Sequence, residues 1–343
     1  MPRSTSTSRA TSRRGAVVGL LLAAAVGVAA LFAVRQMKAE SEPDASDPVV
    51  RAERPAFDAA RAFADVERQV AFGPRVPGTD AHAATLSWLV ARLDSLGLAV
   101  DTQPVAFADP ADSTRLFRGT NILARFRPEA ARRVLLAAHW DSRPFADNDP
   151  DPERRGDPVP GANDGASGVA VLLEVARLLG VSPPPGPLGV DVVLFDLEDL
   201  GESTGDPLDV PYAAGSELFA QANPSVRPAW GILLDMVGDR DLRIPREGFS
   251  QRYAPAVMDH VWAAARHVGA PAFLDEVGGA IQDDHIAFLG RGIPVVDLIH
   301  TPFPDTWHTV SDLPDRVAPE SLGQVGRVVV EAVWSDTETG GPS

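Results

Sequence analysis

Histidines and aspartates recur along the chain at the ends of apolar runs, and their side chains could bind a metal ion. The five that stand out by this position are His139, Asp164, Asp199, Asp235 and His308. Any one of them alone would be an ordinary loop residue, because short motifs arise often by chance. Taken together they offer only nitrogen and oxygen donors, which zinc accepts when no thiolate is present. The sequence therefore predicts a metal centre built from several strand ends.

Glu198 directly precedes Asp199 and follows the apolar run VDVVLF. Adjacent residues in a strand or tight loop point to opposite sides, so the two acids rarely bind one ion together. One of them can bind the metal while the other faces the substrate. A carboxylate held beside a cation in a cleft can carry protons during a reaction.

The composition narrows the classes of protein and of site. The chain has 343 residues, of which 45% are hydrophobic and 23% charged, as in a packed globular protein. Its formal charge of −16 disfavours binding to nucleic acid. The absence of cysteine excludes disulfides, thiol nucleophiles and thiolate metal sites.

The elements that must position these residues alternate along the chain. Six apolar or β-branched runs predict strands, at Val100–Phe107, Asn121–Phe126, Val134–Ala138, Val190–Phe195, Ile232–Leu234 and Pro294–Ile299. Six amphipathic patterns predict helices, at Phe57–Phe72, His82–Leu96, Gly168–Leu179, Tyr212–Ala222, Pro255–Val268 and Pro319–Trp334. This alternation predicts an α/β domain, a three-layer sandwich whose central sheet is mixed, mostly parallel and flanked by helices. Reactive groups are then expected where the carboxyl ends of the strands meet.

The first residues predict a membrane segment. Arg3, Arg9, Arg13 and Arg14 precede the apolar run Gly15–Val34, which is about the ~20 residues that a helix needs to cross a bilayer. We expect a cytoplasmic tail and signal anchor over residues 1–39, a polar linker over 40–54 and an extracytoplasmic catalytic domain over 55–343. A cleaved signal peptide, which would give a secreted protein, is the alternative.

Seven strings, in this order, resemble the motifs of the glutaminyl cyclases (glutaminyl-peptide cyclotransferases), a branch of the M28-type zinc aminopeptidase clan. They are AAHWDS, GANDGASGVAVLLEVARLL, FDLED, GSELFA, LLDMVGD, QDDHIAFLGRGIPVVDLI and PFPDTWHT. The resemblance covers about Phe57 to Trp334 and implies a zinc exopeptidase-like fold. The last two strings resemble the cyclase branch in particular, whereas the His-x-Asp element and the acidic pair are shared by the clan.

The resemblance implies a role for each matching residue. One zinc ion would be held by Asp164, Asp199 and His308. Glu198 matches the general acid and base, and Asp235 and Asp283 match the acids of the network beside it. The matching pocket residues are Gln282, Phe303 and Trp307. His139 and Asp141 match the His-x-Asp element, in which a carboxylate orients a metal-binding histidine.

The implied reaction converts the N-terminal glutamine of a peptide or protein to pyroglutamate and releases ammonia. A two-metal aminopeptidase is the alternative, with His139 and Asp235 completing a second metal site. A non-catalytic ectodomain that keeps the fold is a third reading, but no ligand or base of the motif set is missing. The oligomeric state and the natural substrate stay open.

Three positions depart from the cyclase pattern. Asp199 stands where a glutamate is usual, Trp140 replaces a more common tyrosine, and the loop GESTGDPLDVP lacks the tryptophan of the animal cyclases. The shorter Asp199 carboxylate leaves the metal geometry open, and the missing tryptophan implies a different pocket wall.

Overall fold

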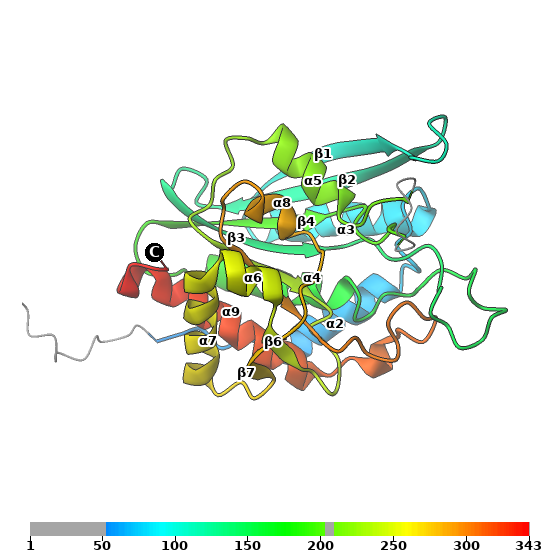
Figure 1. Cartoon of the computed structure of the whole chain (residues 1–343). Helices are drawn as coiled ribbons and strands as arrows, with labels where there is room; N and C mark the ends of the chain where they lie inside the picture. Colours follow the sequence, from blue (N-terminus) through cyan, green and yellow to red (C-terminus); the bar gives the residue numbers. More distant parts are fainter. Residues whose placement is uncertain (1–52, 203–208, 343) are drawn as a thin grey trace, which may run out of the picture. The chain divides into compact units, whose positions relative to one another are not determined.

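A six-stranded mixed sheet forms the centre of the part of the chain described by this computed structural model, residues 53–202 and 209–342 (Figure 1). The strand order is β1-β2-β4-β3-β5-β8. The strands are β1 (Ala99–Ala108), β2 (Leu116–Phe126), β3 (Arg132–His139), β4 (Leu188–Phe195), β5 (Gly231–Asp235) and β8 (Val295–Ile299). All six correspond to the predicted runs, with ends that differ by a few residues.

The pairing pattern divides the sheet into two parts. β1 pairs with β2 and β2 pairs with β4 in the antiparallel sense. The other three pairings, β4 with β3, β3 with β5 and β5 with β8, are parallel. The prediction of an α/β fold with a mixed sheet flanked by helices is therefore confirmed.

Helices cover both faces of this sheet. The helices are α2 (Ala59–Val70), α3 (Asp80–Ser95), α4 (Ala166–Val181), α5 (Ala214–Ala222), α6 (Gly248–Tyr253), α7 (Pro255–Val268), α8 (Ile286–Leu289) and α9 (Pro319–Thr339). In β3, Val134 and Leu136 pack into the larger core with α2, α4, α7 and α9. Leu135 and Ala137 point to the opposite face and pack with α5 and α8. Because both faces are covered, the strands read as continuous apolar runs in the sequence.

Short polar signals fix where the helices begin and end. The Asp58 and Thr79 side chains accept hydrogen bonds from backbone N–H groups in the first turns of α2 and α3. Pro255 opens α7, and Gly269 ends it in the left-handed conformation that glycine adopts without strain.

Several short elements were not predicted from the sequence. Strands β6 (Ile244–Arg246) and β7 (Phe273–Val277) pair in a separate two-stranded sheet. Helices α6 and α8 and the 3₁₀ turn Pro314–Arg316 have six, four and three residues. Such lengths are too short for a hydrophobic period to be recognised.

The predicted anchor and nearly all of the predicted linker lie outside the described residues. Within those residues, no helix has both the length and the apolar character needed to span a bilayer.

Candidate functional site

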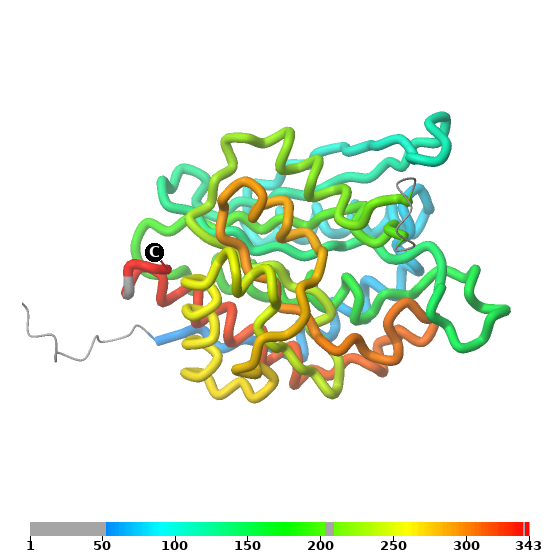
Figure 2. The backbone as a smooth tube through the Cα atoms, in the orientation of Figure 1, coloured from blue at the N-terminus to red at the C-terminus, as the bar shows by residue number. Residues whose placement is uncertain are grey.

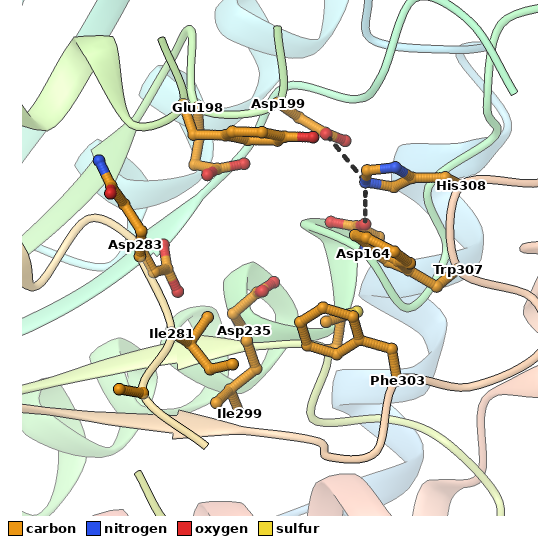
Figure 3. Close-up of a pocket in the computed structure, with 14 residues that line it drawn as sticks. Asp164, Glu198, Asp199, Asp235, Ile281, Asp283, Ile299, Phe303, Trp307 and His308 are labelled. Atoms are coloured by element: carbon orange, nitrogen blue, oxygen red, sulfur yellow. Dashed lines mark ion pairs between the residues drawn. The ribbon is translucent and has the colours of Figure 1, made fainter. Parts of the chain in front are cut away.

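A hollow of about 250 Å³ opens where the predicted strand ends meet (Figure 3). Asp235 ends β5, Glu198 and Asp199 lie just after β4, and His308 lies in the loop beyond β8. The hollow is also lined by Asp164, which precedes α4. Residues far apart in sequence therefore share one cavity, as expected for the carboxyl edge of a parallel sheet.

Asp164, Asp199 and His308 offer ligand atoms that all lie within 4.8 Å of one another. His308 Nε2 is 3.4 Å from Asp199 Oδ1 and 4.0 Å from Asp164 Oδ2, and all three residues are buried. In Figure 3 they lie together on one side of the hollow. The structure therefore brings together the three residues for which the resemblance implies metal binding.

The donor set fits a divalent cation. The Oδ2 atom of Asp199 is buried and has no hydrogen-bond partner in the described part of the chain. Although burial alone lowers the pKa of His308, the carboxylates of Asp199, Asp147 and Asp164 raise it to about 9. The cluster thus carries excess negative charge, and two carboxylates with one imidazole leave an open position on a four-coordinate zinc ion.

Asp147 orients the His308 ring. Its Oδ1 atom is 3.3 Å from His308 Nδ1, so a proton on Nδ1 leaves the Nε2 lone pair facing Asp199 and Asp164. The buried Arg143 guanidinium holds Asp147 by two hydrogen bonds, of 2.7 and 2.8 Å. The same guanidinium donates to the backbone oxygens of Asp199 and Gly201.

The Asp164 loop is fixed by groups distant in sequence. The carboxylate of Asp312 accepts hydrogen bonds from the backbone N–H groups of Asn163 and Asp164, at 2.8 and 3.0 Å. The buried Arg75 guanidinium donates to backbone oxygens of this loop and to that of Trp140. Gly165 has φ +84°, and a Cβ there would lie 2.8 Å from the backbone oxygen of Asp141. Only glycine allows the turn from the loop into α4 at this packing.

A tight turn presents the acidic pair. Leu197 has φ +60°, and the carboxylate of Asp141 accepts hydrogen bonds from the N–H groups of Glu198 and Asp199, at 3.3 and 3.2 Å. Glu198 is 8% exposed and its carboxylate points into the hollow (Figure 3). Burial raises the pKa of Glu198 well above its ordinary value, although His139 opposes the shift. A carboxylate with a raised pKa is a stronger base than an ordinary glutamate, which suits proton transfer.

His139 contacts candidate donors of both predicted metal sites. Its Nε2 atom is 3.0 Å from Asp164 Oδ1 and 3.1 Å from Asp235 Oδ1, and its Nδ1 atom is 3.5 Å from Asp141 Oδ1. Burial raises the pKa of Asp235 to about 7, although the hydrogen bond with His139 opposes the shift. His139, Asp164 and Asp235 form a second compact donor set, so candidate donors for both the one-metal and the two-metal versions lie close together.

The remaining predicted residues line the same hollow. They are Gln282, Asp283, Phe303 and Trp307. The Phe303 and Trp307 rings have centroids 4.4 Å apart, and the Trp307 ring is 3.8 Å from that of His308. Asp283 is 4% exposed and lies across the hollow from the three candidate metal donors (Figure 3). The hollow therefore has an aromatic wall beside the metal donors and an acidic wall opposite them.

The structure shows what surrounds two of the three departures from the cyclase pattern, the loop without tryptophan and Trp140. Tyr212 lines the hollow and packs against Gly201, in the loop that lacks the tryptophan. Trp140 is fully buried, donates its ring N–H to the backbone oxygen of Thr120 and stacks on His82 at 4.3 Å. In the sequence, Tyr212 is marked only as an aromatic residue directly after the variable loop, which is too weak a signal to identify a pocket residue.

The sequence did not indicate that His82 pairs with Asp196. His82 Nε2 is 2.9 Å from Asp196 Oδ2, and Asp196 also accepts from the backbone N–H groups of Thr120 and Leu197. Asp196 immediately precedes the turn that carries Glu198 and Asp199. His82 is therefore buried against the residue that precedes that turn and does not line the hollow.

Comparison with known proteins agrees with the fold and the site. Residues 121–333 match peptidase family M28. A glutaminyl-peptide cyclotransferase-like protein of Mus musculus is 29% identical over 281 residues, which cover 74% of this chain and 70% of that protein.

Solved structures match over nearly their full length. The Porphyromonas gingivalis glutaminyl cyclase is 41% identical with a TM-score of 0.75, covering 80% of this chain and 97% of that one. A leucine aminopeptidase precursor from Bacteroides thetaiotaomicron VPI-5482 is 38% identical with a TM-score of 0.77, covering 82% of this chain and 98% of that one. The resemblance carried by the sequence motifs is thus confirmed, and the chain belongs to peptidase family M28, in its glutaminyl cyclase branch.

Proposed function

We propose that this protein is a zinc-dependent glutaminyl-peptide cyclotransferase that acts on peptides and proteins with an N-terminal glutamine. The observation that carries the proposal is a single hollow that combines three metal donors with a buried, protonatable Glu198 and an aromatic wall. The cyclase names of several relatives support the same activity.

One zinc ion would be held by Asp164, Asp199 and His308. When bound, it supplies a Lewis acid that polarises the γ-carbonyl of the substrate glutamine. The fixed Asp164 loop, the His308–Asp147 contact and the hydrogen bond from the Asp199 N–H to Asp141 would hold the three donors in place before the ion arrives.

Glu198 transfers the proton. The α-amine nitrogen of the substrate forms a bond to its own side-chain carbonyl carbon, and the bond from that carbon to the amide nitrogen breaks. Glu198 accepts a proton from the α-amine and returns it to the departing ammonia, so the carboxylate ends the cycle as it began. Asp235 and Asp283 line the same hollow and would accept hydrogen bonds from the substrate's α-amino group.

The pocket walls hold the side chain in a bent conformation and exclude water. Phe303, Trp307 and Tyr212 supply apolar ring surface, and Gln282 supplies an amide at the rim. Cyclisation needs no water as nucleophile, so exclusion of water favours it over hydrolysis.

A two-metal aminopeptidase is the second candidate, favoured by the compact set His139, Asp164 and Asp235. To distinguish the two, the full chain is incubated with Gln-peptides and with Leu-amide, and metal per chain is measured. Pyroglutamate formation with close to one zinc supports the cyclase. Release of free leucine without cyclisation, with close to two metals, would reject it.

The cellular placement rests on the sequence. The basic residues before the apolar run 15–34 support a membrane-anchored protein whose catalytic domain, 55–343, lies outside the cytoplasm. Membrane fractionation of the full chain tests this: recovery in the soluble fraction at full length would contradict the anchor, and recovery there in shortened form would indicate cleavage.

A further inference from the structure

An apolar groove adjoins the catalytic hollow. It is lined by Phe249, Tyr253, Gln282, Ile286, Leu289 and Gly290 and has a volume of about 280 Å³. Gln282 lines both this apolar groove and the catalytic hollow, so the two cavities meet at its side chain. Helices α6 and α8 form the walls of the groove.

The apolar groove presents ring and aliphatic surface to solvent. Tyr253 is 56% exposed and stacks on Phe249, with ring centroids 6.5 Å apart and planes at 21°. Ile286 and Leu289 are half-buried. Apolar surface gathered next to a cleft is a typical binding surface, whereas isolated exposed apolar residues carry no such meaning.

One buried carboxylate ties the groove to the catalytic hollow. Glu247, which is 1% exposed, accepts hydrogen bonds from the N–H groups of Phe249 and Ser250 at the start of α6. It also accepts one from the N–H of Ile281, at 2.9 Å, and Ile281 lines the hollow. Glu247 therefore joins the groove wall to the hollow wall, and such preorganisation lowers the cost of binding one ligand across both.

We propose that the apolar groove binds an apolar or aromatic side chain from the residues that directly follow the N-terminal glutamine of the substrate. This inference rests on the proposed function, because it takes the first residue of a peptide to lie in the hollow. A chain advances about 3.3–3.6 Å per residue when extended. The second residue therefore reaches the rim at Gln282, and the second or third side chain enters the groove. The uncharged lining selects against acidic and basic side chains there.

Matched peptides test the proposal with the full-length protein. The peptides Gln-Ala-Ala, Gln-Phe-Ala and Gln-Ala-Phe are compared by kcat/KM for pyroglutamate formation and by calorimetric binding. We expect one of the Phe peptides to exceed Gln-Ala-Ala about five- to tenfold in kcat/KM, since an open groove buries only part of a phenyl ring. In Tyr253→Ser that ratio should fall to about twofold or less, by the same area argument.

A matched control separates a groove effect from a loss of exposed apolar surface in general. Val181, at the end of α4, is 66% exposed and lines neither cavity. Val181→Ser should leave the peptide ratio of the wild type unchanged.

Three results would overturn the proposal that the apolar groove binds a substrate side chain. Equal kcat/KM and equal affinity for all three peptides would overturn it, as would a ratio that survives in Tyr253→Ser. A change from dimer to monomer in Tyr253→Ser, with the peptide ratio kept, would assign the groove to a second copy of the chain. Failure of the proposed function gives a different pattern: no pyroglutamate forms from any peptide, while calorimetry still reports whether the phenyl ring adds affinity.

Discussion

Replacing Asp147 by alanine should weaken zinc binding although Asp147 is not among the proposed metal donors. Asp147 Oδ1 lies 3.3 Å from His308 Nδ1 and selects the ring form whose Nε2 faces the metal position. Although burial alone raises the pKa of Asp147, hydrogen bonds from His308 and Arg143 hold that pKa well below its ordinary value. The carboxylate is therefore charged throughout the neutral range and stabilises the Nδ1–H form of the ring.

The expected loss of zinc affinity in Asp147→Ala depends on how exposed the Asp147–His308 contact is. Loss of a carboxylate that orients a metal-binding histidine typically lowers metal affinity by about 10- to 100-fold. The Asp147 side chain is 44% exposed, so solvent screens its interaction with His308. We therefore expect the lower end, about tenfold, which corresponds to about 1.4 kcal/mol of binding free energy.

Competition with a chromophoric zinc chelator measures this change directly. Glu153→Ala removes an exposed acid from the same loop and serves as the control for net charge. Asp147→Asn, which keeps an oxygen acceptor for Nδ1–H, should recover most of the lost affinity. Wild-type affinity in Asp147→Ala, or an equal loss in Glu153→Ala, would refute the orienting role.

Four further outcomes follow from the same structure. Glu198→Gln should lower turnover by about 10²- to 10⁴-fold while zinc stays bound, and zinc loss in this variant would argue against a proton-transfer role. Removal of metal with a chelator should abolish turnover, and activity should return as zinc is added back to about one equivalent if the cyclase proposal holds; recovery that needs two equivalents favours the aminopeptidase. His82→Phe keeps a ring on Trp140 but removes the donor to Asp196, so chemical denaturation should show a loss of about 1.5–3 kcal/mol, whereas an unchanged unfolding midpoint would contradict the pair. Although burial alone raises the pKa of Glu247, hydrogen bonds with His285 and Ser250 lower it from 4.5 to about 2. The ionised Glu247 therefore adds at most about 3 kcal/mol to the free energy of unfolding above pH 4.5, and this stabilisation is lost as pH falls toward the folded-state pKa. Acid denaturation of Glu247→Gln and wild type measures it, and equal acid sensitivity of the two would count against this role.

The main elements and the metal donors could be predicted from the sequence because both leave local signals. Strands buried on both faces read as apolar runs, and several of the candidate donors lie at or near the ends of those runs, as Asp235 does at the end of β5. The family resemblance then ordered these donors into one site. The structure brings these residues together in one hollow, as the resemblance implies. That they bind metal, and whether they bind one ion or two, stays a prediction.

The residues that position the donors could not be predicted in this way. Asp312 holds the Asp164 loop from a distance of 148 residues in sequence, and Arg75 reaches the same loop from 89 residues away. His82 meets Asp196 across 114 residues. Such contacts arise only from tertiary packing, so no spacing in the sequence indicates them.

The loops that carry the two ends of the donor set also support each other directly. Asn148 N–H donates to the backbone oxygen of His308 at 3.2 Å, and Val310 N–H donates to the Asp149 carboxylate at 3.1 Å, so the loops lie side by side (Figure 2).

This arrangement sets the order of events during synthesis on the ribosome. A nascent chain that has exposed Asp164 and Asp199 still lacks His308, and the Asp164 loop still lacks Asp312, its anchor from the same late segment. The partial set offers two carboxylates and no imidazole, and the Asp164 loop lacks one of its supports, so we expect weak zinc binding at that stage. In the proposed site, stable uptake of the ion therefore waits until nearly the whole chain has emerged.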